Sequence, residues 1–266
     1  MTDDPRQSLA DILTTACPTE KAARATQLAE GGLKDLPTFP VANWPGPARR
    51  TKPALKPPSE MPKRGLGTLA GRQALLHAIA HIELNAIDLA ADMAGRFAHD
   101  IPTNRRDEFV ADWLSVMGDE ARHFMMVARR LEEMGTRYGA LPAHDGLFDA
   151  AARTSDDFRA RLAIAPLVLE ARGLDVTPGM IDRLRRSGDD ASADILEVIY
   201  TEEIGHVATG IKWFRLACES AGDSPAPLFK SMVEKHFPGG LKRPFNDDAR
   251  EQAGFERQWY EGLARK

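Results

Sequence analysis

The sequence predicts an all-α protein built around a four-helix bundle, with an N-terminal Pro-rich arm and extra C-terminal helices. Three observations predict this class. Four long segments repeat apolar residues at helical spacing, and no segment of useful length alternates apolar and polar residues as a strand would. In addition, Glu and His recur on the apolar stripes of those segments, where a bundle would bring them together.

The composition is that of a globular chain able to bury a sizeable core. Of the 266 residues, 43% are hydrophobic and 28% are charged, and the net charge of −4 gives no general attraction to nucleic acid or anionic membranes. The two cysteines, Cys17 and Cys218, form no zinc-binding or CxxC pattern. Because the N-terminus lacks signal-peptide features and no apolar run reaches the length of a membrane span, we expect a cytoplasmic protein without membrane contact.

Residues 1–66 are predicted to form two short helices and a Pro-rich arm packed on the bundle. Both helices fall within residues 3–31, where Asp-Pro and Pro-Thr-Glu signals open them and a Gly-Gly pair ends the second. Residues 36–65 contain eight prolines, a density that excludes a helix and favours extended backbone. We expect the arm to lie on the surface of the bundle because apolar side chains are spaced through it: Phe39, Val41, Trp44 and Leu55.

Residues 67–221 are predicted to be the bundle, with long helices near 67–98, 104–135, 154–175 and 189–221. A capping pair, Thr154 and Asp157, opens the third helix, and Pro166 should kink it. We expect a widened space beside the kink, or a tolerated bend without a role. Short helices are expected at 146–153 and from Thr177-Pro178 to about Gly188. Residues 222–266 form a C-terminal extension with helices near 225–236 and 247–264.

Two of the four long helices carry a Glu-x-x-His pair on the apolar stripe. Glu120 and His123 lie in DEARH, and Glu203 and His206 lie in TEEIGH. Because three residues make nearly one helical turn, both side chains of each pair project to one face. The remaining two helices each place a single Glu on the apolar stripe: Glu83 and Glu170. We therefore predict six metal ligands, with the order Glu, Glu-x-x-His repeated twice along the chain.

The cost of burying charge is the physical reason for this prediction. Four ionised carboxylates in a dry core each cost several kcal/mol and repel one another. Protonation could relieve this cost, and salt bridges on solvated helix faces are the other alternative, but the flanking residues at helical spacing are apolar. Two divalent cations neutralise the carboxylates, so we expect two metal ions. Iron in both positions fits the Glu and His donors best, with Mn/Fe and Mn/Mn as alternatives.

The arrangement resembles the ferritin-like di-iron superfamily over residues 67–221. Over nearly the whole chain, the sequence more specifically resembles one bacterial family within that superfamily, the ferritin-like "domain of unknown function 455" family. The segments that carry this resemblance are HIELNAIDLA, DEARHF, YGALPAHDGLFDAA, LVLEARGLDVTPGMI, YTEEIGHVATGIKWF and LKRPFN. The resemblance implies a ferritin-like fold and a dinuclear metal site, and it implies no particular substrate.

Charged neighbours of the ligands suggest an outer layer of the site. Asp119 and Glu202 are placed to accept a hydrogen bond from a ligating imidazole, and Arg122 precedes His123 in DEARH. The form Asp-Glu-x-Arg-His is similar to that of oxygen-activating di-iron proteins. Alternatively, these three are ordinary surface charges. Tyr200, one turn before Glu203, is a candidate catalytic residue that hydrogen-bonds a ligand or carries an oxidising equivalent, with plain core packing as the alternative.

Two groups of polar residues remain without a firm role. A second polar stripe on the first long helix is expected to face solvent or to hydrogen-bond the arm, with an accessory metal or substrate role as the alternative. It consists of His77, His81, Asn85, Asp88 and Asp92. His144 and His236 lie in loops and either line an access route or are surface residues.

The preferred function is an O2-activating oxidase or oxygenase acting on a small organic substrate, with an electron-donor protein as partner and a homodimer as a compatible assembly. Ferroxidase or metal storage is the first alternative, and a di-iron hydroxylase that modifies tRNA or a protein partner is the second. A partner-binding bundle with a vestigial metal site is disfavoured because all six ligand positions are intact. Nucleic acid is an unfavoured partner, although the arm is basic through Arg49, Arg50, Lys52, Lys56, Lys63 and Arg64.

Overall fold

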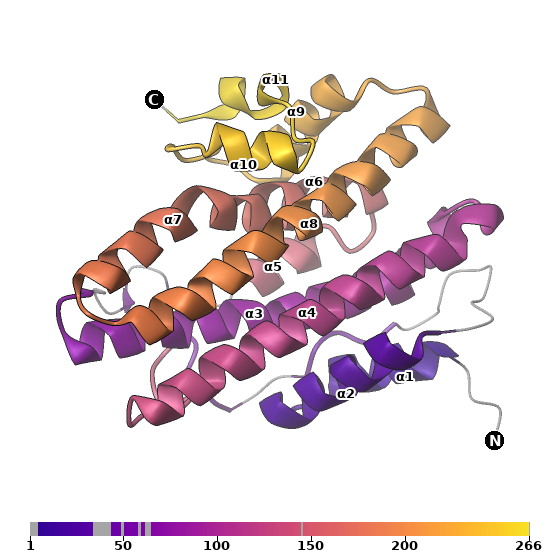
Figure 1. Ribbon diagram of the computed structural model, residues 1–266. Helices are drawn as coiled ribbons and strands as arrows, with labels where there is room; N and C mark the ends of the chain where they lie inside the picture. The colour runs from indigo at the N-terminus through magenta and orange to yellow at the C-terminus, as the bar shows by residue number, and fades with distance from the viewer. Residues whose placement is uncertain are drawn as a thin grey trace. The chain divides into compact units, whose positions relative to one another are not determined.

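The computed structural model describes residues 5–33, 44–48, 51–57, 60–61, 65–144 and 146–265 (Figure 1). Within these residues the regular structure is helical, and the only β pairing is two isolated bridges, Leu55 with Ala143 and Leu241 with Ala264. The all-α class is therefore confirmed. The chain divides into two compact units, Met1–Asp145 and Gly146–Lys266. Because this boundary falls inside the segment expected to be one bundle, the four-helix bundle stays a prediction.

Unit 1 is organised around an antiparallel pair of long helices, α3 (Leu69–Phe97) and α4 (Arg106–Glu133). The Thr68 side chain accepts a hydrogen bond from the Gly71 N–H at 3.1 Å and caps the start of α3. Two 3-10 turns, Ala98–Asp100 and Thr103–Arg105, connect the helices. Both helices match the predicted segments to within two residues.

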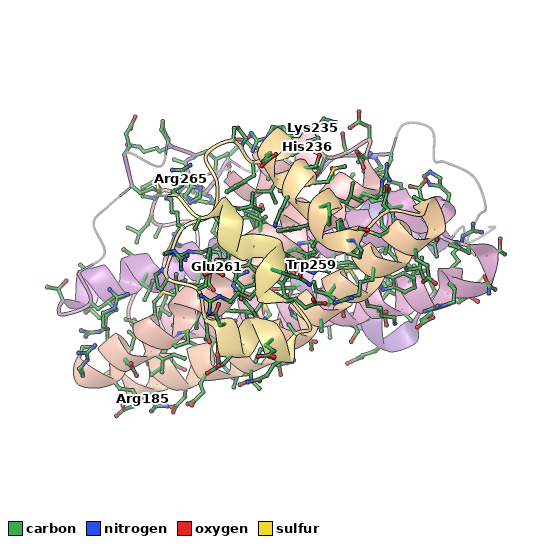
Figure 2. All side chains as sticks on the ribbon, turned by 90° about the horizontal axis from the view of Figure 1, so that it is seen from above. Arg185, Lys235, His236, Trp259, Glu261 and Arg265 are labelled. Atoms are coloured by element: carbon green, nitrogen blue, oxygen red, sulfur yellow. The ribbon has the colours of Figure 1, made fainter. Side chains whose placement is uncertain are left out.

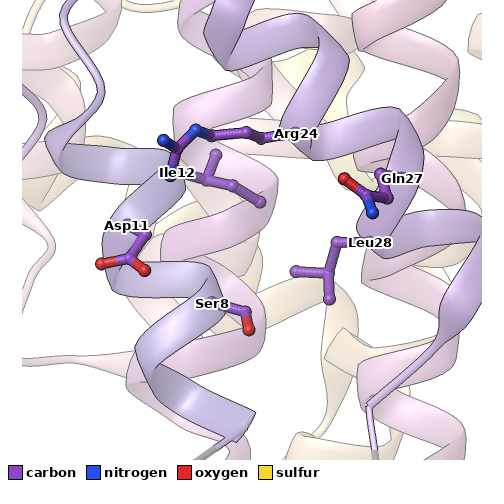
Figure 3. A pocket seen from close by; sticks show the side chains of 6 residues that line it. All are labelled: Ser8, Asp11, Ile12, Arg24, Gln27 and Leu28. Atoms are coloured by element: carbon purple, nitrogen blue, oxygen red, sulfur yellow. The ribbon is translucent and has the colours of Figure 1, made fainter. Parts of the chain in front are cut away.

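Two short helices, α1 (Pro5–Thr14) and α2 (Pro18–Gly31), pack on this pair, α1 against α3 and α2 against α4. Their bounds confirm the two helices expected within residues 3–31. The contact between α2 and α4 is close, since a Cβ atom at Gly118 would lie 2.8 Å from Ala29 Cβ. An open groove between α1 and α2 is lined by Ser8, Asp11, Ile12, Arg24, Gln27 and Leu28 (Figure 3).

In the described part of the Pro-rich arm, Trp44 lies against α3, whereas Leu55 pairs with Ala143 and is exposed. Trp44 Nε1 donates to Asp92 Oδ1 at 2.8 Å, and the Trp44 ring covers Gly95, where any Cβ atom would overlap it. Phe39 and Val41, four of the eight prolines, and the basic residues Arg49, Arg50, Lys63 and Arg64 lie outside the described residues.

The second polar stripe of α3 is buried, so the expectation that it faces solvent is wrong. Asp88 is 4% exposed and forms an ion pair with Lys21 of α2, which is fully buried. The Lys21 ammonium also donates to the Leu13 carbonyl at 3.0 Å. The Trp44–Asp92 bond bears out the alternative that the stripe hydrogen-bonds the arm, whereas the contact of Asp88 with Lys21 of α2 was not expected. Solvent is excluded because α2 and the arm cover this face.

Unit 2 contains the remaining helices, which Figure 1 shows in pink to yellow. They are α5 (Gly146–Arg153), α6 (Phe158–Ile164), a π-helical turn (Ala165–Glu170), α7 (Ala171–Arg186), α8 (Asp190–Ala221), α9 (Pro225–His236), α10 (Asp247–Gln252) and α11 (Arg257–Tyr260). The bounds of α5 and α9 are those predicted.

The third long helix differs from its prediction at its start. Thr154 and Asp157 were expected to open it as a pair, but only Asp157 caps it, accepting from the Ala160 N–H at 3.0 Å. The Thr154 hydroxyl instead accepts a hydrogen bond from Arg161 Nε at 2.9 Å. The helix begins at Phe158 because Asp157, with extended backbone, is its N-cap.

The predicted break near residue 175 is wrong, because α7 continues through Pro178 to Arg186. A proline inside a helix leaves the carbonyl four residues earlier without its usual N–H donor. That carbonyl belongs to Leu174, and the side-chain amide of Asn246 donates to it at 3.1 Å. A residue distant in sequence thus satisfies the backbone group that Pro178 would otherwise leave unbonded.

The single helix predicted over 247–264 is also wrong, because the structure has two short helices there. Gly254 has φ +76° between them, a conformation that ends α10 and that favours glycine. The segment folds back so that Phe255, Trp259 and Tyr260 enter an apolar cluster with Phe229. Figure 2 labels Trp259 and, just after α11, Glu261.

One described helical stretch, Leu69–Asp100, is long and apolar enough to span a membrane, contrary to the expectation from the sequence. Its most apolar window is 78% buried inside the protein, which favours a core helix over a membrane span.

The two cysteine thiols are expected to differ strongly in reactivity. Cys17 is exposed at the start of α2, where a hydrogen bond with the Thr19 side chain lowers its pKa. Cys218 is buried, and burial raises its pKa to about 11. Since the thiolate is the reactive form, iodoacetamide at pH 7.5 should label one thiol rapidly. Mass spectrometry should find that label on Cys17, and Cys17→Ser should abolish it; rapid labelling of Cys218 would contradict the structure.

Candidate metal centre

Unit 1 brings three of the predicted ligands together. One donor atom each from Glu83, Glu120 and His123 lies within 4.8 Å of the others. His123 Nδ1 is 3.3 Å from Glu83 Oε2 and 3.7 Å from Glu120 Oε2. The three side chains are almost fully buried, with exposed fractions of 4%, 1% and 0%.

The packing of α3 against α4 creates this cluster. Glu120 and His123 are one turn apart on α4 and therefore share the face that meets α3. The residues around them on the same helices are buried and apolar: Ile79, Ala80, Ile87, Met117, Ala121, Phe124 and Val127. Water is therefore unavailable to solvate these charges, and the cluster must be compensated internally.

The pKa values of Glu83 and His123 reflect the cost of burying several charges close together. Burial raises the pKa of Glu83 well above its usual value, and the charge of Glu120 raises it further, while His123 opposes the shift. Burial alone would lower the pKa of His123, but its contacts with Glu120 and Glu83 outweigh that effect and raise the pKa to about 11. These shifts favour the protonated forms of Glu83 and His123, which reduce the net negative charge of the buried cluster.

The donor chemistry fits a divalent metal ion. Glu83 Oε2 is buried and makes no hydrogen bond to any described residue, although His123 lies nearby. Carboxylate oxygen and imidazole nitrogen are ligands that suit Fe, Mn and similar dications. The cluster of Glu83, Glu120 and His123 can therefore hold a metal ion.

In unit 2 the second Glu-x-x-His pair is also buried, with its two residues one turn apart on a helix. Glu203 and His206 lie one turn apart on α8, exposed by 9% and 3%, with His206 Nδ1 3.5 Å from Glu203 Oε1. Glu170 ends the π-helical turn, and its Oε2 atom is shielded from solvent. Among the described residues of unit 2, no three donors are as close as those of Glu83, Glu120 and His123.

The residues predicted to surround the ligands have identifiable contacts. Arg122 Nη2 donates to Asp119 Oδ1 at 2.6 Å, and the side chains are 43% and 35% exposed, as in an ordinary surface ion pair. Glu202 is half-buried on α8. The Tyr200 hydroxyl accepts from Asn246 Nδ2 at 3.0 Å. Their proposed roles in supporting the ligands or in catalysis stay predictions.

Sequence reasoning missed Tyr138, which organises the histidines of the second polar stripe. Its ring stacks on His77 and His81, and its hydroxyl is 2.8 Å from His81 Nδ1. His77 Nε2 accepts from the Gly139 N–H at 2.9 Å. Phe124, the neighbour of His123, packs edge-on against Tyr138. The only sequence signal was the position of Tyr138 in YGALPAHDG, and neither His144 nor His236 belongs to the cluster of Glu83, Glu120 and His123.

The fold and the site together define an all-α protein with buried Glu and His donors that can hold a metal ion. The chain belongs to the family described as protein of unknown function (DUF455), whose model matches residues 11–261. It is 37% identical to an uncharacterised protein of Haemophilus influenzae over 262 residues, covering 94% of this chain and 90% of that relative. No solved structure matches the chain. Membership of the family is thereby confirmed, whereas the wider ferritin-like assignment stays a prediction.

The metal-free protein should lose stability as the pH rises. Both Glu83 and His123 have raised pKa values: the contribution of Glu83 is lost as the pH rises above 4.5, and that of His123 is present below pH 6.5 and is lost as the pH rises towards 11. Glu83→Gln removes one partner of His123 and should flatten this loss. Urea unfolding of chelator-treated protein at pH 6 and pH 9 measures it. Glu132→Gln, an exposed change on α4, is the control, and an equal pH dependence in all three proteins would contradict the assignment.

Proposed function

We propose that the protein is a di-metal carboxylate protein with iron in both positions, Mn/Fe or Mn/Mn being the alternatives. The observation that carries the proposal is the buried group of donor atoms from Glu83, Glu120 and His123, all within 4.8 Å. The second unit repeats the same set of residue types, one Glu before one Glu-x-x-His pair: Glu170, Glu203 and His206.

Charge compensation supports two ions rather than one. The six residues carry four carboxylates, and two dications would neutralise them while each imidazole completes one coordination sphere. The ligand set contains only oxygen and imidazole nitrogen, which favours iron and manganese over metals that prefer thiolate. A cation would also take over the role that protons play at His123 and Glu83 in the metal-free protein.

We further propose that the protein is an oxidase or oxygenase. The bound metal pair would supply the redox chemistry for activating O2 and oxidising a small organic substrate, with electrons delivered by a donor protein. The chain's own residues would hold the ions, exclude water from them and keep the ligating imidazoles oriented. The buried apolar residues on both sides of Glu120 and His123 support the exclusion of water.

The N-terminal segment favours an enzyme over a storage cage. A storage protein needs only a compact bundle, whereas here the Lys21–Asp88 ion pair and the Trp44–Asp92 hydrogen bond tie α2 and the arm into α3. These additions are integral to the unit that contains the candidate site. Ferroxidase or metal storage remains the alternative proposal, because the same donors would serve it. A hydroxylase acting on tRNA or on a protein partner is the second alternative, supported only by the basic composition of the arm.

Removal of a ligand should remove metal. We expect two metal ions per wild-type chain, and one or fewer in Glu120→Ala and in His206→Ala, because each leaves a coordination sphere incomplete. Inductively coupled plasma mass spectrometry after desalting measures the content. The matched controls are Glu132→Ala on the outer face of α4 and His99→Ala in the 3-10 turn that follows α3. Both variants should keep two ions. Unchanged stoichiometry in the ligand variants would refute the assignment.

Oxygen consumption should separate the enzyme from the ferroxidase. For an enzyme, uptake measured with an oxygen electrode should continue in the presence of an organic reductant after all added ferrous ion is oxidised. A ferroxidase should stop at the amount that the added iron explains. Size-exclusion chromatography complements this measurement, since a monomer or homodimer fits an enzyme and a large cage would favour storage.

A further inference from the structure

The helix that carries Glu170 is irregular just before that residue. Residues Ala165–Glu170 form a π-helical turn, with Pro166 near its start and Glu170 at its end. In a regular α-helix the ring of Pro166 would meet the carbonyl of Leu162, and Pro166 has no N–H to bond it. The wider π turn accommodates the proline by including one extra residue, and such turns occur frequently at functional sites.

A glycine on the neighbouring helix matches this turn. A Cβ atom at Gly210 would lie 2.5 Å from Pro166 Cβ and 2.6 Å from Pro166 Cγ. Gly210 is therefore the residue that lets α8 approach the π turn. It shares a helix face with Glu203 and His206, because the three residues are spaced by three and four positions.

The register of α7 against α8 places Glu170 and His206 at the same height along the helix pair. α7 and α8 are joined by a three-residue connection, Ser187 to Asp189, and pack side by side in opposite directions (Figure 1). Pro166 and Gly210 lie at equal sequence distances from Gly188, as expected for residues facing each other in this hairpin. Moving four residues on from Pro166 reaches Glu170, and moving four residues back from Gly210 reaches His206.

We propose that Pro166 and Gly210 are positioning residues that hold the π turn and thereby aim Glu170 at the level of His206. The inference rests on the proposed di-metal function. It identifies the contact that orients Glu170, the predicted ligand that lies in a π-helical turn. Because a π turn contains one extra residue, its relaxation to α-helix would rotate Glu170 by about 100° relative to α6.

The contact is tight enough to matter for metal binding. Carbon atoms in contact are about 3.5–4.0 Å apart, so a methyl group at Gly210 would displace the rigid Pro166 ring by about 1 Å. Ligand distances in protein metal sites fall within about 0.2 Å of their usual values. A shift of the π turn on this scale would therefore weaken coordination by Glu170 without requiring the unit to unfold.

The test loads the full-length protein anaerobically with ferrous ion and compares three variants with the wild type. Pro166→Ala restores an N–H and lets the π turn relax. Gly210→Ala introduces the methyl group. Gly205→Ala is the matched control, since it lies on the same helix and its Cβ would have nothing within 4 Å. Iron per chain, ferrous-ion affinity and the melting temperature of the metal-free form are measured for each.

We expect Pro166→Ala to melt at or above the wild-type temperature in the metal-free form, yet to bind ferrous ion about tenfold more weakly or to lose one ion per chain. Gly210→Ala should lose iron in the same way, and Gly205→Ala should match the wild type. A contact important only for folding would lower the melting temperature and leave the affinity unchanged.

Wild-type stoichiometry and affinity in folded Pro166→Ala would overturn the inference, and so would failure of that variant to fold. If Gly210→Ala does not fold, Pro166→Ala alone decides. If the wild type and Gly205→Ala themselves bind no ferrous ion, the proposed iron site fails and the inference fails with it. That result is distinct from selective loss of iron in the Pro166 and Gly210 variants.

Discussion

The structure depends on the compensation of negative charge inside a helical core. Glu83 and Glu120 are buried side by side with His123, where neither water nor a surface cation can solvate them. The raised pKa values of Glu83 and His123 favour their protonated forms, which lower the net negative charge of the cluster. A divalent cation does the same without protonating its ligands, so the local electrostatics and the proposed metal chemistry have one cause.

A second buried polar face on α3 explains why unit 1 needs its N-terminal segment. Asp88 would lose its partner Lys21 in an isolated helix pair, whereas Asp92 is bonded by Arg96 within α3 and gains Trp44 of the arm as a further donor. Breaking one side of such a buried pair leaves an uncompensated charge, which costs about 3–5 kcal/mol. Helix α3 therefore carries the candidate metal ligand Glu83 on one face and a structural polar network on another.

Unit 2 contains two prolines in one long helical stretch, and each of them removes a backbone N–H donor from the helix. The π turn absorbs Pro166, and Asn246 bonds the Leu174 carbonyl that Pro178 leaves without its usual N–H donor. Arg250 then binds Asp175 through two hydrogen bonds of 2.8 Å, so the C-terminal segment holds α7 from outside. The extension beyond residue 221 is consequently part of the scaffold that keeps the helix bearing Glu170 in place.

The sequence alone determined the all-α class, most helix bounds and the two Glu-x-x-His pairs, because these depend on local spacing along one helix. It also contained the segments that resemble the DUF455 family, and the match over residues 11–261 confirms membership of that family. The continuation of α7 through Pro178, the π turn at Pro166 and the burial of Asp88 and Asp92 were decided only by tertiary structure. In each case the deciding partner is distant in sequence, as Asn246, Gly210, Lys21 and Trp44 are, and periodicity within one segment carries no information about such contacts.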